Sequence, residues 1–369
     1  RPTILMPTHE FYPKRGGIGV YIEALASAAS NTHDVTVFAP RNESLNRQTY
    51  SFNLEQLPVR GNQNIHNIFK TLVIIRQACK QNPNAILCLA EPAPIRSIMM
   101  GILLGMCPTN PIVLVLHGTE LQQFRSRVDM RFEFQKLLNR VKRIGVVSHY
   151  NENWLRKHFD VSQKEIHQVP GTLRRDFAPK ILPEKKANPK RINLLTVGRI
   201  HPRKGQIRVL EAINHLPEDT QKRITWRIAG PTVDAHYAQK LRATATQCKS
   251  EIIFENELSD QKLKKAYAQA DIFIMTSMAH KKSIEGLGMV YLEAGAWGVP
   301  SIAHDIGGVS DAVLDEETGL LVSPQDLQAL TTSLDQLIND ETLRMKLGER
   351  ARTHALSHTW DDNVARLFT

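Results

Sequence analysis

The fold of this chain is decided near its start. Residues 3–39 read TILMPTHEFYPKRGGIGVYIEALASAASNTHDVTVFA. A short apolar run, residues 3–6, ends in a loop rich in proline and glycine, and an amphipathic segment, residues 20–29, has helical spacing. A second apolar run, residues 34–39, completes a β–loop–α–β unit. Such units build a parallel sheet that is covered by helices.

The same alternation continues along the chain. In the first half we expect strands at residues 85–89, 111–116 and 143–147, and helices at residues 65–79, 94–107 and 124–141. A stretch rich in breakers, residues 170–191, interrupts the pattern. In the second half we expect strands at residues 192–197, 225–229, 252–254, 272–275 and 300–303, and helices at residues 327–338 and 342–355.

The fold class that follows is α/β, with two doubly wound Rossmann-like domains facing a central cleft. We expect an acceptor-binding domain at residues 1–180 and a donor-binding domain at residues 181–355. A last helix, within residues 356–369, is expected to pack back on the first domain. Ligands of open α/β sheets bind at the carboxyl ends of the strands, so the cleft is the expected site.

Charge is unevenly distributed. Residues 1–180 hold 23 Lys and Arg against 13 Asp and Glu, whereas residues 181–369 hold 24 of each. The first half therefore attracts anionic partners. A segment with Arg125, Arg131, Lys136 and Arg140 suggests either a solvated helix face or contact with an anionic membrane surface.

Cysteines and apolar runs limit the class of protein further. The four cysteines lack C-x-x-C or metal-ligand spacing and are expected to be reduced thiols. The apolar run at residues 98–107 is shorter than the roughly 20 residues that span a bilayer. We expect a cytoplasmic protein, with the inner face of the cytoplasmic membrane as a candidate surface.

Two motifs in the second half have residues suited to a nucleotide diphosphate. Residues 198–205 read GRIHPRKG between a strand and a helix, and Arg199 and Lys204 there suit a diphosphate. Residues 285–293 read EGLGMVYLE, in which a Gly-x-Gly turn opens a helix whose N-terminus can bind an anion. Glu285 could then accept from sugar hydroxyls and Glu293 from a ribose. Solvated surface charges are the plainer interpretation of both motifs.

Two weaker motifs lie in the first half. His117 and Gly118 follow a strand, where a histidine is either structural or a ligand contact. Lys14 to Gly19 form a glycine-rich loop after the first strand, and its glycines allow close approach of a phosphate.

Together these motifs resemble the retaining glycosyltransferases of GT-B architecture, family four. The sequences around Lys204 and at residues 285–294 most resemble those of GDP-mannose-dependent phosphatidylinositol mannoside mannosyltransferases. The resemblance implies catalytic roles for His117, Arg199, Lys204 and Glu285. It implies donor binding by Gly16, Gly17, Arg199, Lys204, Glu285, Gly286, Leu287, Gly288, Met289, Val290 and Glu293.

The function expected from this resemblance is transfer of a hexose, with mannose as one candidate, to a lipid-linked or glycan acceptor. GDP-mannose is the favoured donor and a UDP-sugar the alternative. We expect no cofactor and no metal, because no Asp-x-Asp pair is present, and no nucleic-acid partner, because no basic motif is interleaved with aromatics. A sugar-nucleotide epimerase and a non-catalytic nucleotide-sugar or nucleic-acid-binding protein remain as alternatives.

Overall fold

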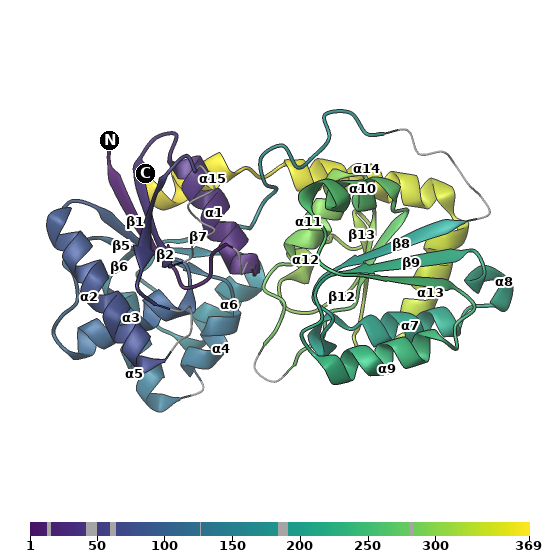
Figure 1. Cartoon of the computed structure of the whole chain (residues 1–369), viewed down its shortest axis with the longest axis horizontal. Coiled ribbons are helices and arrows are strands. Elements are labelled where there is room, and N and C mark those ends of the chain that lie inside the picture. The colour runs from purple at the N-terminus through teal and green to yellow at the C-terminus, as the bar shows by residue number, and fades with distance from the viewer. Residues whose placement is uncertain (13–15, 42–49, 60–63, 126, 184–190, 281–282) are drawn as a thin grey trace. The chain divides into compact units, whose positions relative to one another are not determined.

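The chain forms two compact units. The computed structural model describes residues 1–12, 16–41, 50–59, 64–125, 127–183, 191–280 and 283–369. One unit contains Arg1–Gly171 and Thr359–Thr369, and the other contains Thr172–His358 (Figure 1). The division therefore follows Gly171, earlier than the expected boundary after residue 180.

In the described part of the first unit, seven parallel strands form one sheet in the order β3-β2-β1-β4-β5-β6-β7. Its strands are β1 (Thr3–Pro7), β2 (Asp34–Pro40), β3 (Asn53–Leu57), β4 (Ile86–Leu89), β5 (Ile112–Leu116), β6 (Val141–Val146) and β7 (Ile166–Gln168). Its helices are α1 (Gly17–Ala29), α2 (Ile65–Gln81), α3 (Pro92–Leu103), α4 (Thr119–Arg125), α5 (Val128–Arg140), α6 (His149–His158) and α15 (Trp360–Phe368).

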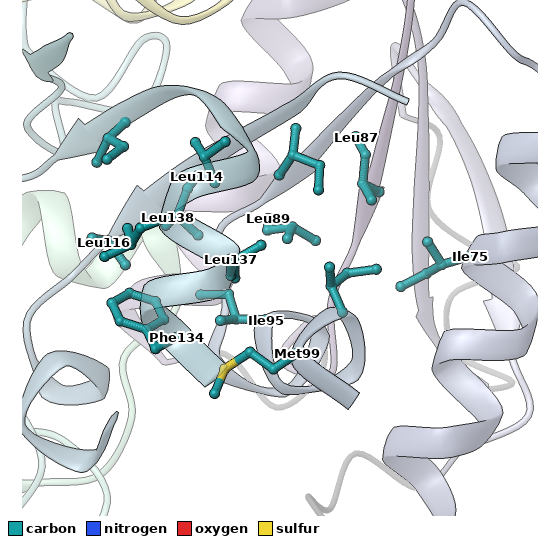
Figure 2. Close-up of a cluster of buried hydrophobic side chains, with 14 of the residues drawn as sticks. Ile75, Leu87, Leu89, Ile95, Met99, Leu114, Leu116, Phe134, Leu137 and Leu138 are labelled. Atoms are coloured by element: carbon teal, nitrogen blue, oxygen red, sulfur yellow. The ribbon is translucent and has the colours of Figure 1, made fainter. Parts of the chain in front are cut away.

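The central strands of this sheet are apolar on both faces because helices cover both. Figure 2 shows part of the resulting core, in which side chains of β4 and β5 meet those of α3 and α5. All five residues of β5 are buried, and so are Phe134, Leu137 and Leu138 of α5. Near-continuous apolar strands are typical of parallel sheets, which is why the sequence pattern identified them.

Helix α15 belongs to the first unit although it lies at the end of the sequence. Trp360 packs edge-on against Tyr21 of α1, with ring centroids 4.9 Å apart. The Asn363 amide donates to the Pro170 carbonyl at 2.8 Å. Leu367 is 1% exposed and lies against Gly145, where an added Cβ would meet its Cδ2 at 2.9 Å. Thr359 and Asp362 form a capping box that fixes the start of the helix.

Within the described residues, the second unit has six parallel strands in the order β10-β9-β8-β11-β12-β13. Its strands are β8 (Ile192–Val197), β9 (Ile224–Ala229), β10 (Glu251–Glu255), β11 (Ile272–Met275), β12 (Ser301–His304) and β13 (Gly319–Val322). Its helices are α7 (Gln206–Asn214), α8 (Glu218–Gln221), α9 (Ala235–Ala245), α10 (Asp260–Gln269), α11 (Met289–Ala296), α12 (Val309–Ala312), α13 (Leu327–Asn339) and α14 (Glu341–Leu356). Figure 1 shows α7 and α9 on one side of this sheet and α10 and α14 on the other.

The prediction of a single helix at residues 124–141 is wrong. The chain forms α4 and α5 instead, because Arg127 is extended, with φ −125° and ψ 130°, and precedes the first turn of α5. Each helix buries its own apolar residues, Phe124 in α4 and Phe134 in α5. The helix expected at residues 94–107 ends at Leu103, and Gly105 then adopts a φ of +67°.

We predict that Leu367→Ala destabilises the first unit selectively. Truncating a buried leucine typically lowers the free energy of unfolding by about 2–5 kcal/mol. Urea unfolding combined with hydrogen exchange should show faster exchange in α1, β6 and β7, and an unchanged second unit. Leu356→Ala, at a position 45% exposed in α14, is the matched control. Equal effects of the two substitutions would contradict the assignment of α15 to the first core.

Candidate functional site

The motif residues of the second unit gather at one edge of its sheet. The strand order reverses between β8 and β11, and both strands point their carboxyl ends to this edge. In open α/β sheets, this switch point is where ligands bind. Three segments that follow strands meet there: the turn after β8, the residues after β11, and the loop after β12.

The turn after β8 is held by a glycine that no other residue can replace without strain. A short 3-10 helix, Pro202–Lys204, is capped by His201, whose Nδ1 accepts from the Arg203 N–H at 3.1 Å. Gly205 follows with a φ of +68°, and a Cβ there would lie 1.8 Å from the Thr276 carbonyl oxygen. The Thr276 hydroxyl donates to the Gly205 carbonyl at 2.7 Å. This packing fixes Lys204 beside the end of β11.

Glu285 is the centre of the arrangement. Its Oε2 accepts from the Lys204 ammonium at 2.7 Å and from the Ser277 hydroxyl at 3.0 Å, and Arg203 Nη1 lies 3.8 Å away. The side chains of Lys204 and Glu285 are each 11% exposed. The Gly308 N–H donates to the Glu285 carbonyl at 3.0 Å. Glu285 is thus held through both its backbone and its carboxylate.

The charge state of Glu285 follows from these contacts. Burial alone would raise its pKa, but the Lys204 ammonium and the Arg203 guanidinium outweigh burial and lower the pKa to about 2. The carboxylate is therefore ionised at pH 7. In the described part of the chain its Oε1 makes no hydrogen bond, so one charged oxygen remains available to a hydroxyl of a ligand.

The turn that follows Glu285 leads into the N-terminus of α11. Gly288 is the N-cap residue of this helix, with a φ of +86°, and it makes no side-chain cap hydrogen bond to the first amides. Leu287 is buried, whereas Gly286, Met289 and Val290 are partly exposed. Free amides at the start of a helix attract anions. Arg199, which precedes Lys204 in the turn after β8, is exposed.

Glu293 lies further along α11 and has a different partner. Its Oε2 accepts from the Tyr267 hydroxyl at 2.9 Å. Burial raises the pKa of Glu293, and the hydrogen bond from Tyr267 lowers it in part. Lys204, Glu285 and the turn 286–290 thus form one cluster, and Glu293 is supported separately by α10.

In the first unit, His117 also lies at the carboxyl edge of its sheet, directly after β5. Its ring packs edge-on against Tyr21, with centroids 4.7 Å apart, and one ring nitrogen bonds the backbone of Ala90. Nε2 is buried without a partner among the described residues. Burial lowers the pKa of His117 to about 4, so the ring is neutral at pH 7. Glu120 Oε1 accepts from the backbone N–H groups of His117 and Gly118.

The glycine-rich loop is only partly described. Lys14 and Arg15 lie outside the described residues. Gly16 and Gly17 are exposed at the start of α1, as a phosphate contact would require. A carboxylate is already close by, however, since Glu10 Oε1 accepts from the Gly19 N–H at 3.3 Å.

Sequence reasoning missed Ser277, Arg203 and Tyr267 as partners of the two motif glutamates. Thr276 and Ser277 were a detectable signal, because polar residues that follow a buried strand often line a site. The described residues contain no cluster of three or more His, Cys, Asp or Glu side chains arranged to hold a metal ion. No helix within the described ranges is long and apolar enough to cross a membrane.

Comparison with known proteins identifies both units. The family described as Glycosyltransferase Family 4 matches residues 15–173, and the family described as Glycosyl transferases group 1 matches residues 178–354. A GDP-mannose-dependent alpha-(1-6)-phosphatidylinositol monomannoside mannosyltransferase of Mycolicibacterium smegmatis is 27% identical, covering 99% of this chain and 97% of its own. A GDP-mannose-dependent monoacylated alpha-(1-6)-phosphatidylinositol monomannoside mannosyltransferase of Corynebacterium glutamicum is 26% identical, covering 98% of this chain and 96% of its own.

Solved structures agree on the fold. Sucrose-phosphate synthase from Thermosynechococcus elongatus superposes with a TM-score of 0.79 at 18% identity, covering 99% of this chain and 97% of its own. Anabaena HepE, in complex with UDP and glucose, gives 0.76 at 16% identity, covering 99% and 98%. The chain is a glycosyltransferase of GT-B architecture, made of a Family 4 domain and a group 1 domain.

Proposed function

We propose that this glycosyltransferase moves mannose from GDP-mannose to a phosphatidylinositol mannoside or a similar lipid-linked glycan. We further propose that it retains the anomeric configuration, needs no divalent metal and works at an anionic membrane surface. The observation that carries the donor and the acceptor is the similarity, over nearly the whole chain, to two mannosyltransferases whose names specify both.

The donor-binding chemistry of the second unit supports this proposal. A nucleotide diphosphate carries roughly two negative charges, and departure of the sugar adds another. Lys204, held by Glu285, and exposed Arg199 supply cations, and the N-terminus of α11 adds about half a positive charge. The free Oε1 of Glu285 suits a hydroxyl of the transferred sugar.

The reaction we propose breaks the bond between the anomeric carbon and the β-phosphate oxygen, whose electron pair leaves with GDP. The acceptor oxygen bonds the same face of that carbon, and its proton passes to a departing phosphate oxygen. The protein stabilises charge and orients the two partners. Within the first unit, neutral His117 offers Nε2 to a hydroxyl of a ligand.

The membrane proposal rests on exposed side chains of α2 and α5 in the first unit. Val128 and Phe132 lie one turn apart on α5 and are 87% and 62% exposed, beside exposed Arg131. On α2, Ile65, Phe69 and Val73 form an apolar row at helical spacing and are 74%, 41% and 42% exposed. Helices α2 and α5 both pack on α3. Exposed apolar and basic residues on one helix are typical of interfacial binding.

A donor panel tests the function. Thermal shift with GDP, UDP and ADP should favour GDP, since a ligand at 100 times its dissociation constant stabilises the folded state by about 2.7 kcal/mol. GDP-mannose with a phosphatidylinositol mannoside should then give a mannosylated lipid. Product from a UDP-sugar alone would overturn the donor assignment, and isomerised sugar nucleotide without an acceptor would indicate an epimerase.

We predict that Glu285→Gln lowers kcat/KM by roughly 10- to 100-fold, the range expected for a lost hydrogen bond to a charged group. The substitution removes the anion that neutralises Lys204 and holds the sugar. GDP binding, measured by thermal shift, should persist in the folded variant. Glu251→Gln is the matched control, because Glu251 lies at the start of β10 and pairs with exposed Arg191. An unchanged kcat/KM in Glu285→Gln would refute the role.

We predict that transfer survives excess EDTA, because protein cations replace a metal at the diphosphate. Arg199→Ala and Lys204→Ala should each cause a large loss of activity. Lys222→Ala, an exposed cation next to α8, should not. Activity that disappears in EDTA and returns with magnesium or manganese would contradict metal independence.

We predict that the protein cosediments with vesicles rich in anionic lipid at low salt, because each basic residue near such a surface contributes about 1 kcal/mol. Arg131→Gln with Phe132→Ser should weaken this binding. Arg156→Gln with Lys157→Gln, which changes two exposed cations of α6, should weaken it less. Equal sedimentation with neutral and anionic vesicles would exclude the proposal.

A further inference from the structure

Tyr267 is a buried residue of the second unit that lies outside both sequence motifs, residues 198–205 and 285–293. It lies on α10, is 0% exposed, and its hydroxyl donates to Glu293 Oε2 at 2.9 Å. Its ring packs edge-on against Phe177, with centroids 5.8 Å apart, and lies 6.1 Å from the ring of Phe273. Phenylalanine would fill the same space. The hydroxyl group is tolerated in the core because it is hydrogen-bonded to Glu293, since burying an unbonded hydroxyl is costly.

The hydrogen bond restricts how Glu293 can present its carboxylate. A glutamate on a helix has several rotamers, and a charge-assisted bond from a fixed phenol selects among them. Oε2 is engaged, so Oε1 is left to a ligand. The neighbouring charges of Arg174 and Asp260 pair with each other, because Arg174 donates to both carboxylate oxygens of Asp260, at 3.1 and 3.0 Å. The Arg174 guanidinium also lies 5.5 Å from the centroid of the Phe177 ring.

We propose that Tyr267 is a positioning residue that orients Glu293 toward the ribose of the nucleotide, so that the site selects ribonucleotides over deoxyribonucleotides. This inference rests on the proposed function and on the contact between Glu293 and the ribose that the sequence motif leads us to expect. In nucleotide-binding α/β folds, a carboxylate commonly accepts hydrogen bonds from ribose hydroxyls. Discrimination against a sugar that lacks the hydroxyl is strong only when the acceptor is held in place, because a mobile carboxylate turns to water instead.

The experiment compares GDP with 2′-deoxy-GDP and 3′-deoxy-GDP by calorimetry. The wild-type protein should bind GDP more tightly than at least one deoxy analogue. Tyr267→Phe should raise the Kd for GDP about fivefold, the order expected for one hydrogen bond, and leave the Kd for that analogue nearly unchanged. In transfer assays KM for the donor should rise more than kcat falls, because ribose binding is shared by ground and transition states.

A matched control separates positioning from packing. Phe177→Leu removes the ring contact with Tyr267 and keeps the hydroxyl. It should lower stability without changing the ratio of the two affinities. If Phe177→Leu reduces the ratio as much as Tyr267→Phe does, packing alone is responsible and the proposal is wrong.

The pH profile gives a second readout. Burial raises the pKa of Glu293, Asp260 raises it further, and Tyr267 and Arg174 lower it. Binding through an ionised carboxylate is lost as pH falls through this pKa. Tyr267→Phe removes one lowering influence, so the acid limb of GDP binding should move to higher pH. An acid limb at the same pH in both proteins would overturn the proposal.

The Glu293→Gln variant distinguishes failure of the positioning role of Tyr267 from failure of the ribose role of Glu293. If it reduces the ribose preference and Tyr267→Phe does not, Glu293 binds ribose without help from Tyr267 and only the positioning role fails. If Glu293→Gln leaves the preference intact, the ribose role fails and the positioning role with it. Binding of UDP in place of GDP would instead refute the proposed donor, and UDP with 2′-deoxy-UDP would then test Tyr267 in the same way.

Discussion

The buried ion pair between Lys204 and Glu285 joins two turns that are 81 residues apart in the sequence. Either charge alone would destabilise the unit, because removing one partner of a buried pair typically costs about 3–5 kcal/mol. The pair forms only if Gly205 lies against Thr276 and the Glu285 backbone is held by the loop after β12. The turn after β8, the end of β11 and the approach to α11 are therefore established together. This contact therefore links the segments that make up the anion-binding edge of the second unit.

Local patterns predicted most strands of both sheets and the residue types of the site, but they missed β3, β7 and β13. Apolar runs located β5 and β8, and glycines in the motifs marked turns that the structure shows to be sterically required at Gly205 and Gly288. The pairing of Lys204 with Glu285 could not be predicted, because nothing local links them. The partner of Glu293 was missed for the same reason: Tyr267 lies 26 residues away on another helix. The break between α4 and α5 depends on the backbone of Arg127, and the apolar spacing does not reveal it.

The two units differ in the electrostatics of their strand ends. In the second unit, cations meet Glu285, and α11 begins at Gly288 without a side-chain cap. In the first, residues that follow β1, β4 and β5 include three carboxylates, Glu10, Glu91 and Glu120, although this half of the sequence carries the whole net positive charge. Burial raises the pKa of Glu91, hydrogen bonds from two backbone N–H groups lower it in part, and the charges of Glu10 and Glu120 raise it, with a net value of about 7. Among the described residues of the first unit, the excess of basic over acidic side chains lies on the helices. This distribution suits a surface role more than binding of the donor phosphates.

The assignment of α15 to the first unit makes that unit discontinuous along the chain. The polypeptide leaves it at Gly171 and returns at Thr359. A ribosome adding about 5–20 residues per second must make the whole intervening stretch before Trp360 can reach Tyr21. During that interval the surface of α1 and β6 that α15 later covers is exposed to water and to chaperones. The second unit, by contrast, is continuous and can fold as soon as it emerges. Synthesis from the N-terminus to the C-terminus therefore allows the second unit to complete its fold before the first unit does.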